Sequence, residues 1–197
     1  MNNNELTKVI KKVMPTVVSI IISKKKEMVE KELPEQLMPA FPWETPEKTE
    51  IPEELVDVHG MVRVGSGSGF IVRQDGLIIT NKHVVADKDA VYAIYTNDGK
   101  KYDTEVLARD PLDDIAILKI EAEGLPTVAL GDSDALDLGM PVLAIGNALG
   151  LFRNTVSYGI VSGLSRAIQA NAPGANPLKE PAVIQELRGL IQTDAAI

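Results

Sequence analysis

The sequence predicts an all-β fold with a closed antiparallel barrel in the first half of the chain. Aromatic residues make up only 4% of the 197 residues, whereas Val, Ile, Leu, Thr and Gly are frequent, which favours thin β-layers. Short apolar stretches recur between tight turn signals, as is typical of strands joined by hairpins. Closing six such strands into a barrel would remove exposed sheet edges. The strands are expected at residues 16–23, in the two arms of a hairpin within 65–83, and at 90–96, 102–108 and 115–120.

A short amphipathic helix is expected before the first strand. Apolar residues recur at helical spacing from Leu6 to Met14, and Asn4 is a favourable N-cap. Pro15 stops the pattern, so we predict a helix over residues 4–14 that docks on a sheet. The β-branched run Thr16–Ser23 then forms the first strand.

The segment from Lys24 to about His59 differs in composition from the rest. Lysine and glutamate alternate in it and five prolines interrupt any strand periodicity, so a functional insertion or a linker is predicted. We interpret Lys24–Lys26 as the solvated end of the preceding strand. The apolar cluster Leu37–Trp43 holds the only tryptophan, and flanking prolines favour an extended conformation. This cluster either docks on a groove or a neighbouring subunit, or folds back on its own domain.

A second β unit is predicted after a link over residues 121–126. A glycine-bounded turn is expected at Gly146–Gly150, and a loop rich in Ala, Asn and Pro at Arg166–Pro181. The strands of this unit are expected at residues 127–130, 141–145, 155–164 and 183–193.

Composition argues against several classes of function. The formal net charge is −8 and the longest basic run is only Lys24–Lys26, which disfavours a nucleic-acid binder. The absence of cysteine removes a thiol nucleophile and a thiolate zinc site, and two histidines, His59 and His83, are too few for a histidine-rich metal centre. We therefore expect no metal and no other cofactor. The first residues lack a signal-peptide pattern and no apolar run is long enough to span a membrane, so either the protein is cytosolic or a targeting segment precedes Met1.

His83 stands at the exit of the predicted hairpin, where a scaffold would fix it while leaving it open to solvent. A histidine there can act as a general base if a carboxylate fixes its tautomer, and the loop before the strand at 115–120 offers Asp113 and Asp114. Asp114 suits that role better, because it directly precedes the strand whereas Asp113 lies further into the loop. Taken alone, these residues are also explained by a structural histidine and a solvated turn.

Eight short motifs follow one another along nearly the whole chain. They are KVMPTVVSI at 12–20, GSGFI at 67–71, TNKHVV at 80–85, DDIAILKI at 113–120, LGDSD at 130–134, AIGN at 144–147 with Gly150, GIVS at 159–162 and IQTDAAI at 191–197. In this order they resemble the HtrA (Deg) family of chymotrypsin-fold serine proteases. The resemblance implies a chymotrypsin-like double β-barrel, with a complete first barrel, an incomplete second barrel and a short N-terminal helix. It also implies that His83 is the general base and Asp114 its orienting carboxylate.

The resemblance further implies that the nucleophile lies beyond Ile197. In the family, the stretch that matches Thr193–Ile197 is followed by Gly-Asn-Ser-Gly-Gly, which carries the catalytic serine and the oxyanion-hole amides. Ser133 is a poor substitute, because the carboxylates on both sides of it would oppose an alkoxide. Ser66 and Ser68 precede a strand and are interpreted as hairpin or turn residues.

The family organisation predicts a helix in residues 1–15, a first barrel in 16–122 with an insertion at 24–64, and a partial second barrel in 123–197. By analogy, the insertion reaches other active sites or shapes an oligomer, and the loop at 166–181 senses activating ligands. A peptide-binding PDZ domain is expected downstream of Ile197.

The function implied by the resemblance is that of a serine endopeptidase of protein quality control, with residues 1–197 alone inactive. Its implied partners are unfolded polypeptides and further copies of itself in a homo-oligomer, a trimer in the family. Family members are extracytoplasmic or membrane-tethered. The alternative is a non-catalytic binding or chaperone module that holds unfolded chains, using the barrel and Leu37–Trp43.

Overall fold

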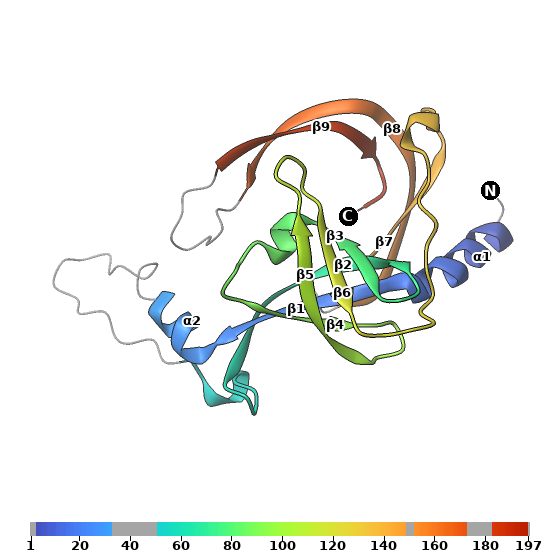
Figure 1. Cartoon of the computed structure of the whole chain (residues 1–197). Coiled ribbons are helices and arrows are strands. Elements are labelled where there is room, and N and C mark those ends of the chain that lie inside the picture. The colour runs from blue at the N-terminus through green and yellow to red at the C-terminus, as the bar shows by residue number, and fades with distance from the viewer. Residues whose placement is uncertain (1–2, 33–50, 149–151, 173–182, 197) are drawn as a thin grey trace.

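Six antiparallel strands between Val17 and Ile120 close into a barrel (Figure 1). The computed structural model describes residues 3–32, 51–148, 152–172 and 183–196. The strands lie in the order β1-β2-β3-β6-β5-β4, and β4 pairs again with β1, which closes the sheet on itself. Their bounds are β1 Val17–Lys25, β2 Met61–Arg73, β3 Leu77–Thr80, β4 Val91–Tyr95, β5 Lys101–Arg109 and β6 Ala116–Ile120.

Alternating aliphatic residues fill this barrel. On β6, Ala116, Leu118 and Ile120 are buried, whereas the residues between them are only half-buried. Each fully buried Ile, Leu or Val side chain stabilises the fold by about 1.5–3 kcal/mol. The core consists of Val18, Ile20, Ile71, Ile78, Val84, Val85, Tyr92, Ile94, Ala116, Leu118 and Ile120.

The β2–β3 hairpin turns at Gly76. This residue has a φ of 93°, and a Cβ there would lie 2.2 Å from the carbonyl oxygen of Ile120. Only glycine fits both conditions. The Ile120 N–H donates to the Gly76 oxygen at 3.0 Å, so the turn packs on the end of β6. The Asp-Gly turn expected from the sequence therefore helps to fix the barrel.

Regular structure surrounds β1 on both sides. The helix α1, Asn3–Val13, precedes it as predicted, and α2, Lys26–Glu32, follows it. β1 and β2 also extend past the barrel as a two-stranded ribbon, with Lys25 paired to Met61. A 3-10 turn, η3, spans Glu53–Leu55. The prediction that Lys24 to about His59 lacks regular structure is therefore wrong near both of its ends. The cluster Leu37–Trp43 lies outside the described residues.

Lys24 is buried, so its interpretation as a solvated strand end is wrong. Its Nζ donates to both carboxylate oxygens of Glu32 on α2, at 2.6 and 2.7 Å, and lies 2.9 Å from Asp87 Oδ2. Two carboxylates from distant segments thus neutralise an ammonium that would otherwise need water. Burial alone would lower the pKa of Lys24, but the hydrogen bonds from Lys24 to these carboxylates outweigh it and hold the pKa above its ordinary value.

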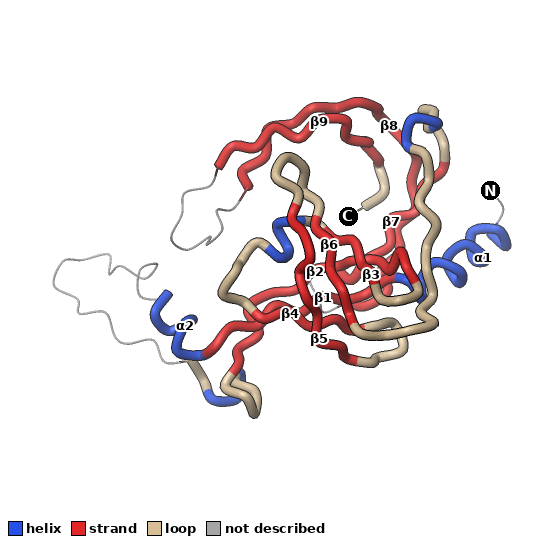
Figure 2. The backbone as a smooth tube through the Cα atoms, in the orientation of Figure 1, coloured by secondary structure: helices blue, strands red, loops and turns tan. Residues whose placement is uncertain are grey.

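The second β unit is a three-stranded antiparallel sheet in the order β7-β8-β9. Its strands are β7 Pro141–Ala148, β8 Phe152–Ala172 and β9 Val183–Thr193. Figure 2 shows β8 and β9 as a long arch beside the barrel. The predicted all-β class, with a complete first barrel and an incomplete second one after a short helix, is confirmed.

Three boundaries in this second unit differ from the prediction. Residues 127–130 form no strand; they run as a connection in which the Val128 N–H donates to Ile71 O at 3.0 Å. β7 continues through Gly146 to Ala148, where a turn was expected to begin, and residues 149–150 lie outside the described part. β8 likewise runs through Arg166 to Ala172 instead of ending before it, because pairing with β9 outweighs the weak strand propensity of Ala and Asn.

Candidate active site

The pairing of β3 with β6 brings His83 and Asp114 to the same end of the barrel. Thr80, the last residue of β3, pairs with Ala116, the first residue of β6. His83 follows Thr80 closely and Asp114 closely precedes Ala116, so the two loops leave the barrel side by side. Strand register alone therefore places an imidazole beside a carboxylate.

His83 makes two hydrogen bonds to the Asp114 carboxylate. The ring Nδ1 lies 2.6 Å from Oδ2, and the His83 backbone N–H donates to Oδ1 at 2.8 Å. An ionised carboxylate only accepts hydrogen bonds, so a neutral imidazole in this position carries its proton on Nδ1. Its Nε2 then has a free lone pair, and the His83 side chain is 55% exposed. The arrangement can accept a proton at Nε2 from a group in solution or on a substrate.

The structure distinguishes between the two candidate carboxylates. Asp114 faces His83, whereas Asp113 is exposed and its backbone N–H donates to Asp110 Oδ1 at 2.7 Å. The Leu112 N–H donates to the same oxygen at 2.8 Å. These N–H groups, that of Asp113 first, hold the pKa of the Asp110 carboxyl below its usual range. Asp113 therefore belongs to the turn, and Asp114 is the partner of His83.

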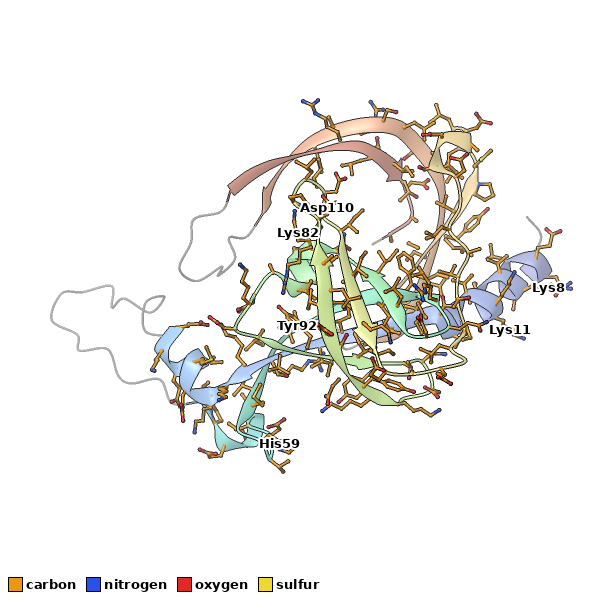
Figure 3. The ribbon with its side chains drawn as sticks, in the orientation of Figure 1. Lys8, Lys11, His59, Lys82, Tyr92 and Asp110 are labelled. Carbon is orange, nitrogen blue, oxygen red and sulfur yellow. The ribbon has the colours of Figure 1, made fainter. Side chains whose placement is uncertain are left out.

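Further contacts fix the Asp110–Asp114 loop to the barrel. The Asp110 N–H donates to the Ile115 oxygen at 2.8 Å, which closes the loop on itself. The Lys82 ammonium donates to the Asp110 carbonyl at 2.9 Å and so joins the loop to the residue before His83 (Figure 3). The histidine and the carboxylate are therefore held by a shared set of hydrogen bonds.

The His83 backbone lies in a 3-10 turn, η4, that spans Lys82–Val85. Val84 and Val85 are buried in the barrel core, which anchors the turn and leaves the imidazole outside. A Cβ on Gly67 of β2 would lie 2.4 Å from Val84 Cγ1, so this glycine makes room for the turn. Arg109, at the end of β5, donates from Nε to the Val85 oxygen at 2.7 Å.

Four supporting residues were not identified from the sequence: Lys82, Arg109, Asp110 and Asn81, whose side-chain Nδ2 donates to Asp114 Oδ2 at 3.1 Å. Asn81 and Lys82 directly precede His83 in the TNKHVV motif, and that proximity was the only available signal for them. The other contacts depend on the register of strands that are far apart in the chain, which no local pattern reveals.

None of the candidate serines is a partner of His83. Within the described part of the chain, the His83 ring hydrogen-bonds only to Asp114. Ser133 lies in a separate 3-10 turn, η5, which spans Ser133–Ala135. Ser66 and Ser68 lie inside β2, paired with Ile21 and Ser19, so they belong to the first arm of the hairpin and neither precede the strand nor form a turn.

A cleft of about 640 Å³ lies between the barrel and β7, next to Asp114. Its walls are mainly apolar, with Ile115 and Phe70 on the barrel side and Leu143 on β7. Asn81 and Asp114 supply polar groups at its edge. The candidate pair therefore borders an apolar cleft, the usual setting of a binding site.

Within residues 3–32, 51–148, 152–172 and 183–196, no cluster of three or more His, Asp or Glu side chains could hold a metal ion. None of the helices found there is long and apolar enough to cross a membrane.

Residues 67–197 match the family model described as a trypsin-like peptidase domain. A probable periplasmic serine endoprotease, DegP-like, from Chlamydia trachomatis serovar D is 41% identical over 131 residues, which cover 66% of this chain and 23% of that protein. The putative serine protease HhoB from Synechocystis sp. is 42% identical over 133 residues, covering 68% of this chain and 29% of the relative. The chain thus spans about a quarter of the length of these relatives.

A solved structure of the HtrA-type protease AlgW with a decapeptide has a similar fold. It superposes with a TM-score of 0.63 at 28% sequence identity, covering 97% of this chain and 51% of that one. The similarity includes both the closed barrel and the three-stranded sheet, because nearly all of this chain is covered.

Proposed function

Because this chain belongs to the trypsin-like peptidase family, in its HtrA (Deg) branch, we propose that it supplies the general base and the orienting carboxylate of a serine endopeptidase. His83 is the base and Asp114 the carboxylate. The observation that supports this most directly is the contact of 2.6 Å between His83 Nδ1 and Asp114 Oδ2, with Nε2 left free.

The proposed reaction follows from the protonation state of His83. Nε2 takes the proton of a serine hydroxyl as that oxygen attacks the carbonyl carbon of a peptide bond. Asp114 stabilises the imidazolium that results, and Nε2 then gives the proton to the leaving amine. An acyl-enzyme remains. Water attacks it with Nε2 again as the base, which releases the acid and restores the serine.

The nucleophile is proposed to come from outside the described residues. The His83 ring has no serine partner among them, and the serines considered above lie in β2 or in η5. We therefore propose that residues 1–197 alone do not hydrolyse peptides. Activity requires a longer parent protein that places a serine hydroxyl on Nε2.

Unfolded or misfolded polypeptides are the proposed substrates, in protein quality control outside the cytoplasm. The relative from Chlamydia is named a periplasmic endoprotease, and the HtrA-type structure was solved with a decapeptide. We also propose that the parent protein forms a homo-oligomer, which light scattering coupled to gel filtration would measure directly.

The experiment compares the parent protein with residues 1–197 on unfolded casein. The parent should cleave casein, and His83→Ala should lower kcat by about 10⁶-fold, the loss typical of removing a triad base. Residues 1–197 alone should not cleave it. His59→Ala is the matched control, because His59 is the other histidine of residues 1–197 and makes no contact with Asp114 among the described residues; it should leave cleavage unchanged.

Two results would contradict the proposal in different ways. Cleavage by residues 1–197 that disappears in His83→Ala would show that the nucleophile lies within them. A parent protein that binds unfolded casein but never cleaves it would instead support the non-catalytic binding module.

A further inference from the structure

Asn81 occupies the N-cap position of the η4 turn but does not cap it. Its φ of −74° and ψ of 143° are those of an ordinary cap residue, yet its side chain accepts no hydrogen bond from the turn. Asparagine at this position normally accepts the N–H of the second or third residue of the turn. Helix capping therefore does not explain the asparagine.

Asp114 takes over the capping role. Its Oδ1 accepts the backbone N–H of His83, the second residue of η4, at 2.8 Å. The Asn81 side chain points instead towards Asp114, with Nδ2 at 3.1 Å from Oδ2 and 3.2 Å from the backbone oxygen. The two side chains have thus exchanged their usual roles: the aspartate caps the turn, and the asparagine acts as a donor to the aspartate.

The Asp114 carboxylate accepts three hydrogen bonds from the described residues, and their donors differ in origin. Two of them come from His83, through the backbone N–H and the ring Nδ1. Among the described residues, the third donor is the Asn81 amide. This donor is the only one of the three that does not belong to His83. It also donates to the backbone oxygen of Asp114.

We propose that Asn81 is a positioning residue that keeps the Asp114 carboxylate in the orientation required by His83 Nδ1. Its catalytic meaning rests on the function proposed above, but the geometry does not. A carboxylate without this donor can turn about its Cβ–Cγ bond towards water, since the Asp114 side chain is 23% exposed. The preference of neutral His83 for a proton on Nδ1 then weakens.

The residue type is also explained by this geometry. An amide carries two N–H donors and so reaches both Oδ2 and the backbone oxygen of Asp114, which a hydroxyl or a carboxylate cannot do. Serine and aspartate are as good as asparagine at an N-cap, so they preserve the turn while removing the donor pair. Aspartate additionally places a negative charge beside Oδ2.

The test uses nitrogen-resolved NMR of the two histidine rings in residues 1–197. Asn81→Ser should lower the ratio of Nδ1–H to Nε2–H tautomer of neutral His83 by about fivefold to tenfold, the value of one lost hydrogen bond. Asn81→Asp should lower it further. The His59 signals are the internal reference, and Asn97→Ser, at an exposed turn, is the matched control and should change nothing.

The outcomes separate positioning from a structural role. The proposal is supported if Asn81→Ser unfolds at the same urea concentration as unsubstituted residues 1–197 but loses the tautomer preference of His83. An unchanged His83 tautomer in folded Asn81→Ser and Asn81→Asp overturns it, whatever the effect on stability. These measurements need no catalysis, so they decide the question even if the protease proposal fails.

A kinetic measurement extends the test to the parent protein. There, Asn81→Ser should lower kcat about fivefold to tenfold and leave KM unchanged, because both hydrogen bonds of the amide go to Asp114 and act on the base through it. A change confined to KM would count against a positioning role.

Discussion

Replacement of Lys24 by methionine should sharply destabilise the protein. Lys24 and Glu32 are both nearly fully buried, and Lys24 Nζ lies within 3 Å of both Glu32 and Asp87. Lys24→Met removes the ammonium that both carboxylates contact, so two like charges remain close together and Glu32 stays buried without its cation. Breaking a buried ion pair from one side costs about 3–5 kcal/mol. With a urea m-value of about 2 kcal/mol/M, the unfolding midpoint should fall by about 2 M.

Urea titration monitored by circular dichroism measures this change, and two variants control it. Lys24→Met/Glu32→Leu removes both charges and should recover most of the loss, since the cost comes from burying the carboxylate without its ammonium. Lys100→Met breaks the exposed pair with Asp98, where water screens the charges, and should leave the midpoint unchanged. This reasoning would be refuted if Lys24→Met lost less than about 1 kcal/mol of unfolding free energy, or if the double variant were no more stable than the single one.

Three further substitutions test the barrel and its turns. Gly67→Ala should lower the free energy of unfolding by about 1–3 kcal/mol, because its Cβ would lie 2.4 Å from Val84 Cγ1. It should also broaden the NMR signals of the ring of His83, the residue before Val84. Gly76→Ala should destabilise the protein more than Gly99→Ala in the same urea assay. Both glycines have positive φ, but only at Gly76 would a Cβ meet a backbone atom, the carbonyl oxygen of Ile120. Equal losses of stability in the two variants would argue against this close approach. Burial raises the pKa of Tyr92 from 10.0 to about 12, so the tyrosine ionises at lower pH in the unfolded chain than in the folded one. The free energy of unfolding should therefore fall by about 2–3 kcal/mol as the pH rises through these values. Tyr92→Phe should reduce this dependence on pH.

Local patterns were sufficient to predict most of the first barrel. Asp-Gly turns such as that at Gly76 mark hairpins, and strand alternation gives the buried face of β6 directly. The failures occur where distant segments decide the outcome. Lys24 is buried because Glu32 and Asp87 converge on it, and the extension of β8 depends on β9 lying beside it.

The candidate site was predicted only in part. His83 and Asp114 follow from motifs and from their positions beside predicted strands, and the structure brings them together. Their supports could not be predicted, because Asn81 and Asp114 meet only through the β3–β6 register. A sequence pattern gives the residue type at each position but not the identity of its distant partner.

The two-stranded ribbon formed by the ends of β1 and β2 leads us to expect that the segment between Lys25 and Met61 can be exchanged. Lys25 and Met61 are a cross-strand pair, and such partners lie about 5 Å apart, so any replacement whose ends meet at that spacing can be joined without moving the barrel. Loop length matters little to such a graft, because closure entropy grows only logarithmically. One chemical condition applies: the replacement must return an acidic side chain to Lys24, as Glu32 does now. The barrel can therefore accept different insertions with little change to the strands that hold His83.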